Sequence, residues 1–124
     1  MRGHARNYDL NPALLAAVIE EESKFRTDAK SSAGAIGLMQ LQPATAKGIA
    51  LRTGGSKFVL SDLYDPEINV RYGAWYLHHL LLKYGDERLA LAAWYQGEQA
   101  VRDHGVYDES TVFVANVLAL RQRM

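Results

Sequence analysis

The feature that most constrains the fold of this chain is a repeated helix-start signal, a short polar residue followed at once by proline. Asn11-Pro12 and Asp65-Pro66 both have this form, in which the polar side chain caps the free amide groups of a first helical turn. Glycines after helix-forming runs mark where such helices end. Helices are predicted over residues 12–24, 43–52, 66–84, 87–95, 98–104 and from a cap at Glu109 or Ser110 to about 122.

Short polar loops separate these predicted helices, and we find no convincing strand, internal repeat or low-complexity linker. A chain of 124 residues is long enough for one domain with its own core. Short connections between capped helices are typical of a compact helical bundle. We therefore expect an all-α fold in which residues 1–124 form a single domain.

Charge, cysteine content and hydrophobicity limit the partners, the chemistry and the targeting segments that this chain could have. Fourteen basic and fourteen acidic residues cancel, so no overall field favours nucleic acid or an anionic membrane. The absence of cysteine removes both a disulfide framework and a thiol nucleophile. No stretch approaches the ~20 apolar residues of a membrane span. The apolar run 14–19 is too short for a signal peptide and ends in glutamates, so we expect no export signal in this chain.

One of three adjacent glutamates in the first predicted helix differs from its neighbours. Glu22 lies four residues after Val18 and three before Phe25, which places it inside the apolar stripe of the helix. The two glutamates before it project to the flanks. Burial and the negative end of the helix dipole both raise a carboxyl pKa, so Glu22 is a candidate general acid. A capping or ion-paired glutamate is the structural alternative.

The loop SSAGAIGLMQLQPATA, residues 31–46, is the second unusual feature. No carboxylate occurs between Asp28 and Asp62, so a cleft formed by this loop would be neutral. Neutral hydrogen-bonding clefts with aromatic walls suit a sugar chain. The polar groups of this cleft would be Ser31, Gln40 and Gln42, and the candidate aromatic residues, each of which could instead pack in the core, are Tyr72, Trp75, Tyr76, Trp94 and Tyr95.

Metal and cofactor signals are missing from the sequence. His78 and His79 are adjacent, so on a helix they diverge and chelate one ion poorly. There is no HExxH motif or cysteine pair. The glycine-rich loop lacks the Gly-Lys-Ser/Thr of a P-loop, and the Gly-x-Ser-x-Gly of many hydrolases is absent. We expect no metal and no cofactor.

Several motifs together resemble one known family. Glu22-Ser23, the run Gly-Leu-Met-Gln at 37–40 and Pro43 closely resemble the soluble lytic transglycosylase domain, a relative of goose-type lysozyme. The resemblance continues through LALAAWYQG and VFVANVLAL and covers about residues 8–120. It implies a lysozyme-like helical fold and cleavage of peptidoglycan at the β-1,4 bond between N-acetylmuramic acid and N-acetylglucosamine.

The resemblance also implies how such cleavage would proceed. Glu22 would be the catalytic acid, and the C6 hydroxyl of the muramic acid would close a 1,6-anhydro ring. Ordinary retaining and inverting glycosidases use two carboxylates, whereas an internal hydroxyl needs only a base, which Glu22 becomes after donating its proton. The proposed chemistry therefore accounts for the missing second carboxylate in the loop.

Four further residues are predicted to contact the substrate: Ser31, Met39, Gln40 and Tyr95. The hydroxyl of Ser31 is expected to hydrogen-bond near Glu22. Trp94 and Phe113 stand where the family commonly has tyrosine. The spacing of Trp94 within LALAAW favours an indole packed in the core, so Tyr95 rather than Trp94 is predicted to supply the polar contact to Glu22 or a sugar.

Two alternative functions stay open from the sequence. One is a hydrolytic lysozyme on the same fold, in which Asp62 or Asp65 would fold back as the second carboxylate. The other is a non-catalytic peptidoglycan-binding module, which the presence of Glu22 disfavours. In each case the expected partner is a glycan strand, and the chain is expected to be a monomer or a module of a larger protein. It would act in the bacterial cell envelope, outside the cell, or as part of a phage.

Overall fold

The computed structural model describes residues 3–4, 8 and 10–123, and within them the fold is all-helical, as predicted. Only two isolated bridges, Lys30 with Ile36 and Ile36 with Leu41, have strand geometry in the described part. The elements in chain order are α2 (Pro12–Ser23), α3 (Pro43–Thr53), the 3₁₀ helix η1 (Leu60–Tyr64), α4 (Pro66–Tyr84), α5 (Glu87–Gln96), α6 (Glu98–His104) and α7 (Asp108–Arg123).

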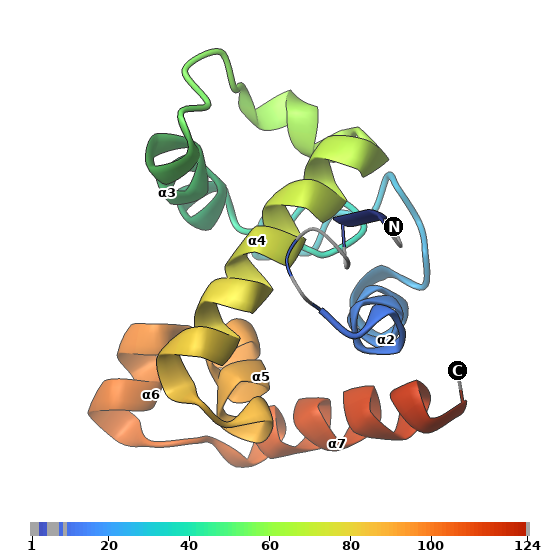
Figure 1. The fold of residues 1–124 in the computed structure, drawn as a ribbon, viewed down its shortest axis with the longest axis vertical. Coiled ribbons are helices and arrows are strands. Elements are labelled where there is room, and N and C mark those ends of the chain that lie inside the picture. The colour runs from blue at the N-terminus through green and yellow to red at the C-terminus, as the bar shows by residue number, and fades with distance from the viewer. Residues whose placement is uncertain (1–2, 5–7, 9, 124) are drawn as a thin grey trace.

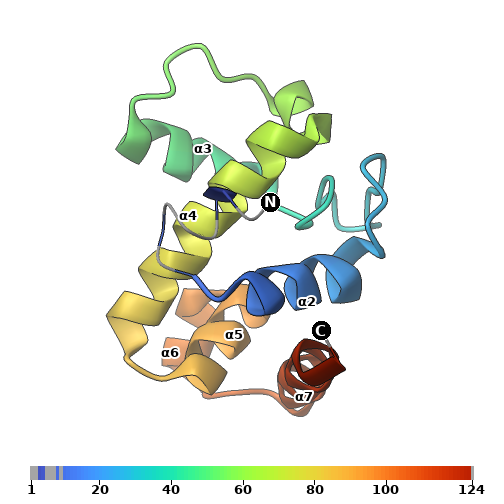
Figure 2. The same cartoon turned by 45° about the vertical axis from the view of Figure 1, so that its right-hand side comes forward.

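The long helix α4 connects two groups of elements (Figure 1). α3 and η1 pack against the N-terminal half of α4, whereas α5 packs against its C-terminal half (Figure 1). α5 and α2 both contact α7, so α5, α6 and α7 gather at the other end of α4 (Figures 1 and 2). The second view shows α2 lying across the middle of the molecule, with its C-terminal end leading into the long loop before α3 (Figure 2).

The predicted helix starts are confirmed. The Asn11 side chain accepts hydrogen bonds from the backbone amides of Ala13 (2.8 Å) and Leu14 (3.3 Å). The Asp65 carboxylate does the same for Glu67 (2.9 Å) and the residue after it. Each cap satisfies amides that have no partner inside the helix. These local signals therefore identify where α2 and α4 begin.

Two features at helix ends differ from the prediction. The last helix begins at Asp108, so neither Glu109 nor Ser110 is its cap. The hydroxyl of Ser110 donates instead to the Gln96 side chain, at 2.8 Å. The short η1 helix was not predicted, because its sequence LSDLY carries no apolar repeat long enough to identify a helix.

The apolar stripe of α2 is only partly as predicted. Val18 and Ile19 are buried in the main core. Phe25 is outside the helix, with 46% of its surface exposed. The helix ends at Ser23, and Lys24 (φ 54°) and Phe25 (φ 62°) both adopt the left-handed conformation, which turns the chain away from the stripe. None of the helices in the described part is both long and apolar enough to cross a membrane.

Candidate active site

A cavity of about 420 Å³ opens at the C-terminal end of α2. Three separate parts of the chain form it: the end of α2 with the following loop, the end of α5, and the segment before and at the start of α7. It brings together four of the five predicted site residues with the predicted polar group Gln42 and several residues not predicted. Its lining consists of Glu22, Ser31, Ala33, Ala35, Gln40, Gln42, Trp94, Tyr95, Gln96, Tyr107 and Glu109.

Glu22 is half-buried in this cavity and is poised to titrate near neutral pH. Burial raises the pKa of its carboxyl from 4.5 to about 7, and the nearby charge of Glu21 acts in the same direction. The indole N–H of Trp94 donates to Glu22 Oε2 at 3.1 Å and opposes this rise, because it stabilises the carboxylate. Glu22 can therefore both hold and release a proton near pH 7, which is what a general acid and base requires.

The loop that follows α2 is tied to the helix by Ser23. This side chain is buried, and its hydroxyl lies within hydrogen-bonding distance of two carbonyl oxygens, Leu38 at 2.7 Å and Ile19 at 3.1 Å. One acceptor belongs to α2 and the other to the loop. The residue next to Glu22 thus fixes the distance between the helix end and the loop that lines the cavity.

A buried asparagine on α4 fixes the same loop from the other side. Asn69 is fully buried, and its Oδ1 accepts from the Met39 amide at 2.8 Å. Its Nδ2 donates to the carbonyls of Ile36 and Leu63, each at 2.9 Å. Gly37 (φ 78°) fits against this amide only because it has no side chain, since a Cβ there would lie 2.3 Å from Asn69 Nδ2.

Ser31 and Gln40 line the cavity as predicted, but their described hydrogen bonds are local to the loop. Ser31 Oγ accepts from the Ala35 amide at 3.0 Å, and none of its described bonds reaches Glu22. Gln40 Nε2 donates to the carbonyls of Gly37 (2.9 Å) and Ala29 (3.2 Å). Both side chains shape the loop, and their contact with a ligand stays a prediction.

The structure does not place the Met39 side chain in the cavity, and its contact with substrate stays a prediction. Met39 has no exposed surface, and the lining of the Glu22 cavity does not include it. It packs instead against Gly73 of α4, where an added Cβ would lie 2.2 Å from the Met39 sulfur. Met39 therefore joins the loop to α4 by close packing, which its flexible thioether suits.

The prediction that Tyr95 rather than Trp94 would make the polar contact to Glu22 is wrong. Trp94 makes the hydrogen bond to Glu22, and its ring also packs at a tilt against Tyr76, with centroids 5.6 Å apart. Tyr95 is 43% exposed and stacks on Phe113 at 4.6 Å. The indole needs one partner for its N–H when it is partly buried, and Glu22 is that partner. Tyr95 still lines the cavity, so its contact with a sugar stays a prediction.

Sequence reasoning missed three residues of the cavity, Gln96, Tyr107 and Glu109. They lie in or beside a region of short helix and turns, where no apolar period shows which way a side chain points. The two aspartates considered as a second carboxylate do not reach the cavity. Asp65 caps α4, and Asp62 accepts from the Val59 amide at 3.1 Å.

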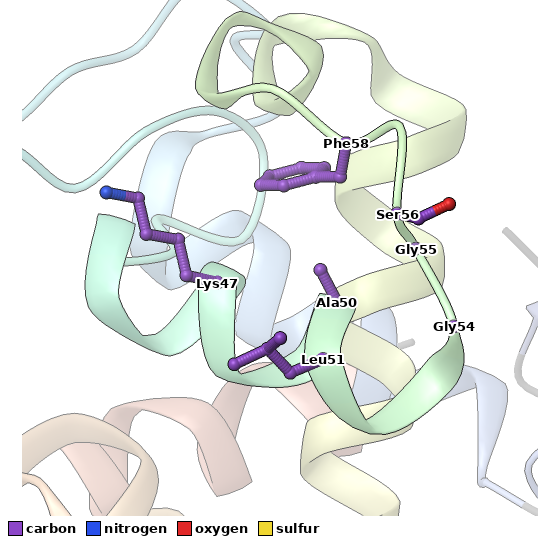
Figure 3. Close-up of a pocket in the computed structure, with 7 residues that line it drawn as sticks. All are labelled: Lys47, Ala50, Leu51, Gly54, Gly55, Ser56 and Phe58. Atoms are coloured by element: carbon purple, nitrogen blue, oxygen red, sulfur yellow. The ribbon is translucent and has the colours of Figure 1, made fainter.

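A second cavity, of about 410 Å³, lies between α3 and the loop that follows it (Figure 3). Lys47, Leu51 and Phe58 are among the side chains that line it, and no carboxylate does. It therefore lacks a carboxylic acid of the kind that protonates a glycosidic oxygen. The described residues also contain no group of three or more histidines and carboxylates close enough to hold a metal ion.

The sequence of this chain is similar to those of known transglycosylases, which agrees with the geometry of the Glu22 cavity. A family model described as Transglycosylase SLT domain matches residues 1–113. The transglycosylase of Enterobacteria phage PRD1 is 40% identical over 90 residues, which cover 73% of this chain and 31% of the phage protein. Membrane-bound lytic murein transglycosylase E of Buchnera aphidicola is 34% identical over 82 residues, which cover 64% of this chain and 37% of that protein.

Solved structures of high similarity also belong to lytic transglycosylases. An inactive mutant of the lytic transglycosylase Slt from Pseudomonas aeruginosa superposes with a TM-score of 0.85 at 32% identity, over 95% of this chain and 22% of that chain. The 70-kDa soluble lytic transglycosylase in complex with bulgecin A gives a TM-score of 0.88 at 25% identity, over 97% of this chain and 22% of that chain. The chain thus spans between 22% and 37% of the length of these four proteins.

The fold and the site together define a lysozyme-like helical domain whose cleft carries a half-buried carboxylic acid. Within that class, the matched residues and the shared fold decide the family. The chain belongs to the transglycosylase SLT domain family.

Proposed function

We propose that this chain is a peptidoglycan lytic transglycosylase domain that cleaves the β-1,4 bond between N-acetylmuramic acid and N-acetylglucosamine. The observation that carries the proposal is Glu22, whose pKa of about 7 lets it act first as an acid and then as a base. Its cavity is otherwise lined largely by neutral polar and aromatic side chains, which suit a sugar chain. Residues 1–124 would form one catalytic module.

The reaction needs one carboxyl group and no water. Glu22 donates its proton to the glycosidic oxygen as the bond from that oxygen to C1 of the muramic acid breaks. The resulting carboxylate then accepts the proton of the C6 hydroxyl, whose oxygen bonds to C1 and closes the 1,6-anhydro ring. An internal nucleophile of this kind gains an effective molarity worth about 7–11 kcal/mol when it is well placed.

Trp94 would orient Glu22 and support the first step without itself taking part in proton transfer. An indole N–H is a donor only, so it cannot act as a base, and it cannot protonate the sugar near neutral pH. Its bond to Glu22 Oε2 (3.1 Å) leaves the other carboxyl oxygen free to face the substrate. Stabilising the carboxylate also favours the product of the first proton transfer.

A hydrolytic muramidase is the second candidate, and one observation favours it. Glu109 lines the same cavity as Glu22, and a second carboxylate is what a hydrolytic glycosidase uses to activate water or to attack C1. Against this, the neighbouring charge that raises the pKa of Glu22 is Glu21 rather than Glu109. The balance therefore favours the anhydro-forming reaction.

Analysis of the reaction products by mass spectrometry separates these candidates. After digestion of purified peptidoglycan, anhydro ends lighter by one water molecule are expected. Hydrated reducing ends would identify a muramidase, and an undigested sample would favour a binding module. Glu22→Gln is the matched control, because the amide can neither donate nor accept the proton, and its products should fall below a tenth of those of the wild type.

The place of action follows from the proposed substrate. Relatives include a phage transglycosylase and membrane-bound bacterial transglycosylases, so the proposed site is the bacterial cell envelope, reached from the host cell or from a phage. The partner would be the glycan strand itself. The domain would work as a monomer or as a module of a longer protein.

A further inference from the structure

The last residue of α5, Gln96, uses its side-chain amide to bind a segment of chain that comes after α6. Its Oε1 accepts two hydrogen bonds, from the Tyr107 amide at 3.0 Å and from the Ser110 hydroxyl at 2.8 Å. Its Nε2 donates to the Gly105 carbonyl at 2.8 Å. One side chain thus joins the end of α5 to three points within six residues.

The segment that Gln96 binds, residues 105–109, has few other attachments. All five residues are exposed, and α6 before them buries no residue. In the described part of the chain, every hydrogen bond between residues 105–110 and the chain before α6 is made by Gln96. A segment with little buried surface opens easily unless specific bonds hold it.

This segment contributes two side chains to the catalytic cavity, Tyr107 and Glu109. Glu22 itself is held by other means, because it belongs to α2 and its hydrogen bond comes from Trp94. The part of the cavity that Gln96 positions is therefore distinct from the part that would transfer the proton.

We propose that Gln96 is a positioning residue, which holds residues 105–109 as a preformed wall of the cavity and thereby sets affinity for the glycan strand. This proposal rests on the proposed function, since it names a determinant of substrate affinity in the same site. A wall that must be ordered on binding lowers affinity by the entropy of that ordering, while a preformed wall does not. The chemical step at Glu22 does not depend on Gln96.

A purely structural role for Gln96 is the competing explanation, and the chain offers a matched control for it. Arg121 Nη1 binds Glu87 Oε2 at 2.6 Å and also joins α5 to α7. Neither residue lines the cavity of Glu22. Arg121→Gln therefore weakens the joint between the same two helices without touching the wall.

The test compares KM and kcat of the full chain on soluble, uncross-linked glycan strands. Gln96→Ala should raise KM about five- to tenfold and change kcat less than twofold, because only binding requires the wall to be ordered. The alkaline limb of its pH profile should stay at the wild-type position, since Glu22 keeps its surroundings. Gln96→Glu retains the acceptor oxygen for Tyr107 and Ser110, so its KM should lie between those of Gln96→Ala and the wild type.

Two results would overturn the proposal. One is a KM for Gln96→Ala equal to that of Arg121→Gln, which would leave only a structural role. The other is an undiminished effect of Gln96→Ala when Tyr107 and Glu109 are already alanine, which would mean that Gln96 contacts the glycan directly.

Binding measurements distinguish failure of this proposal from failure of the proposed function. Tryptophan fluorescence can follow the same glycan strands binding to the Glu22→Gln protein, where no turnover is needed. Weaker binding to Glu22→Gln/Gln96→Ala than to Glu22→Gln supports the role of Gln96 even for a chain that cleaves nothing. Equal binding to both proteins contradicts it, whatever the products of the wild type.

Discussion

Two walls of the same cavity are held in opposite ways. The loop wall, residues 31–42, is fixed by the buried side chains of Ser23 and Asn69 and by backbone hydrogen bonds such as those between Ile36 and Leu41. By contrast, the segment wall, residues 105–109, is exposed. Within the described residues, the side-chain amide of Gln96 alone binds it to the end of α5 by hydrogen bonds. The loop wall is part of the core, whereas the segment wall is only attached to the core.

The difference indicates how tasks are divided within the site. The loop wall follows the helix that carries Glu22, from which residues 24–30 separate it, so its rigidity would help keep the proposed acid in the fixed geometry that proton transfer requires. The segment wall contributes Tyr107 and Glu109 and can move without displacing the acid. Binding and chemistry can therefore be altered separately by changing one wall or the other.

The largest expected effect is on stability, from removing the anchor of the loop wall. Asn69→Ala leaves the Met39 amide and the carbonyls of Ile36 and Leu63 without their buried partner. We expect the free energy of unfolding to fall by about 3–5 kcal/mol, since each unsatisfied buried group costs about 1–3 kcal/mol. Urea denaturation measures this loss.

Urea denaturation after removal of the anchor of the segment wall tests whether the two walls differ in stability. Gln96→Ala should lower the free energy of unfolding by only about 1–2 kcal/mol, because two of its three partners, the Gly105 carbonyl and the Tyr107 amide, belong to exposed residues where water can replace the amide. Only the third partner, the Ser110 hydroxyl, belongs to a buried residue. Asn116→Ala, which loses one exposed bond to Glu21, is the baseline and should be close to neutral. Equal losses for Asn69→Ala and Gln96→Ala would remove the distinction between the two walls.

A second prediction concerns Glu22, which lines the same cavity as the two walls. The pKa of Glu22 rises from 4.5 to about 7 on folding, so the folded state binds more protons than the unfolded state between these values. Stability should therefore fall as pH rises from 4.5 to 7, by about 2–3 kcal/mol in total. Glu22→Gln carries no charge and lacks this dependence.

Thermal or urea unfolding of both proteins across this pH range measures the effect. Glu22→Gln should gain stability relative to the wild type with rising pH, and should exceed it by the largest margin above pH 7. Glu20→Gln, which removes a neighbouring charge outside the cavity, controls for overall charge. A constant difference between wild type and Glu22→Gln from pH 4.5 to 8 would show that the pKa of Glu22 is not raised by folding.

A third prediction concerns the bond from Trp94 to Glu22. Trp94→Phe removes the N–H that stabilises the carboxylate, so the pKa of Glu22 should rise further. A hydrogen bond to a charged group contributes about 1.5–3 kcal/mol, which corresponds to about one to two pH units. The alkaline limb of the kcat/KM profile should move upward by that amount, with a lower maximum because Glu22 is less well oriented.

Trp75→Phe is the matched control for this substitution. Trp75 is also half-buried, and it stacks on His79 at 5.5 Å without lining the cavity. Its pH profile should superpose on that of the wild type. A limb that stays in place for Trp94→Phe, or moves downward, would mean that the indole does not stabilise the Glu22 carboxylate in solution.

Sequence patterns predicted the parts of this molecule that local chemistry decides. The caps at Asn11 and Asp65 act over three residues, so they could be identified without knowing the fold. The position of Glu22 followed from helical period alone, and its partial burial and raised pKa agree with it. The regular helices and the partly buried position of Glu22 were therefore predictable.

Contacts between distant parts of the chain were not predictable in this way. Trp94 meets Glu22 across 72 positions of sequence, and a helical pattern cannot show which of two adjacent aromatic residues turns toward a remote carboxylate. Met39 is buried because Gly73 leaves room for it, a fit that only the packed structure contains. Glu109 and Tyr107 enter the cavity because Gln96 binds their segment.

The smallest expected effect tests the aromatic residue at the edge between the two walls. Tyr95 lines the cavity and stacks on Phe113 with 43% of its surface exposed. Tyr95→Phe keeps the stacking ring, so stability should stay within about 0.5 kcal/mol of the wild type. If the hydroxyl contacts a sugar, KM should rise by about two- to fivefold, the equivalent of one neutral hydrogen bond of about 0.5–1 kcal/mol.

Tyr64→Phe, at an exposed tyrosine outside the cavity, is the control and should leave KM unchanged. A fall in kcat with constant KM would instead place the Tyr95 hydroxyl at the reacting bond. Tyr95 would then share with Trp94 the role of polar contact at Glu22.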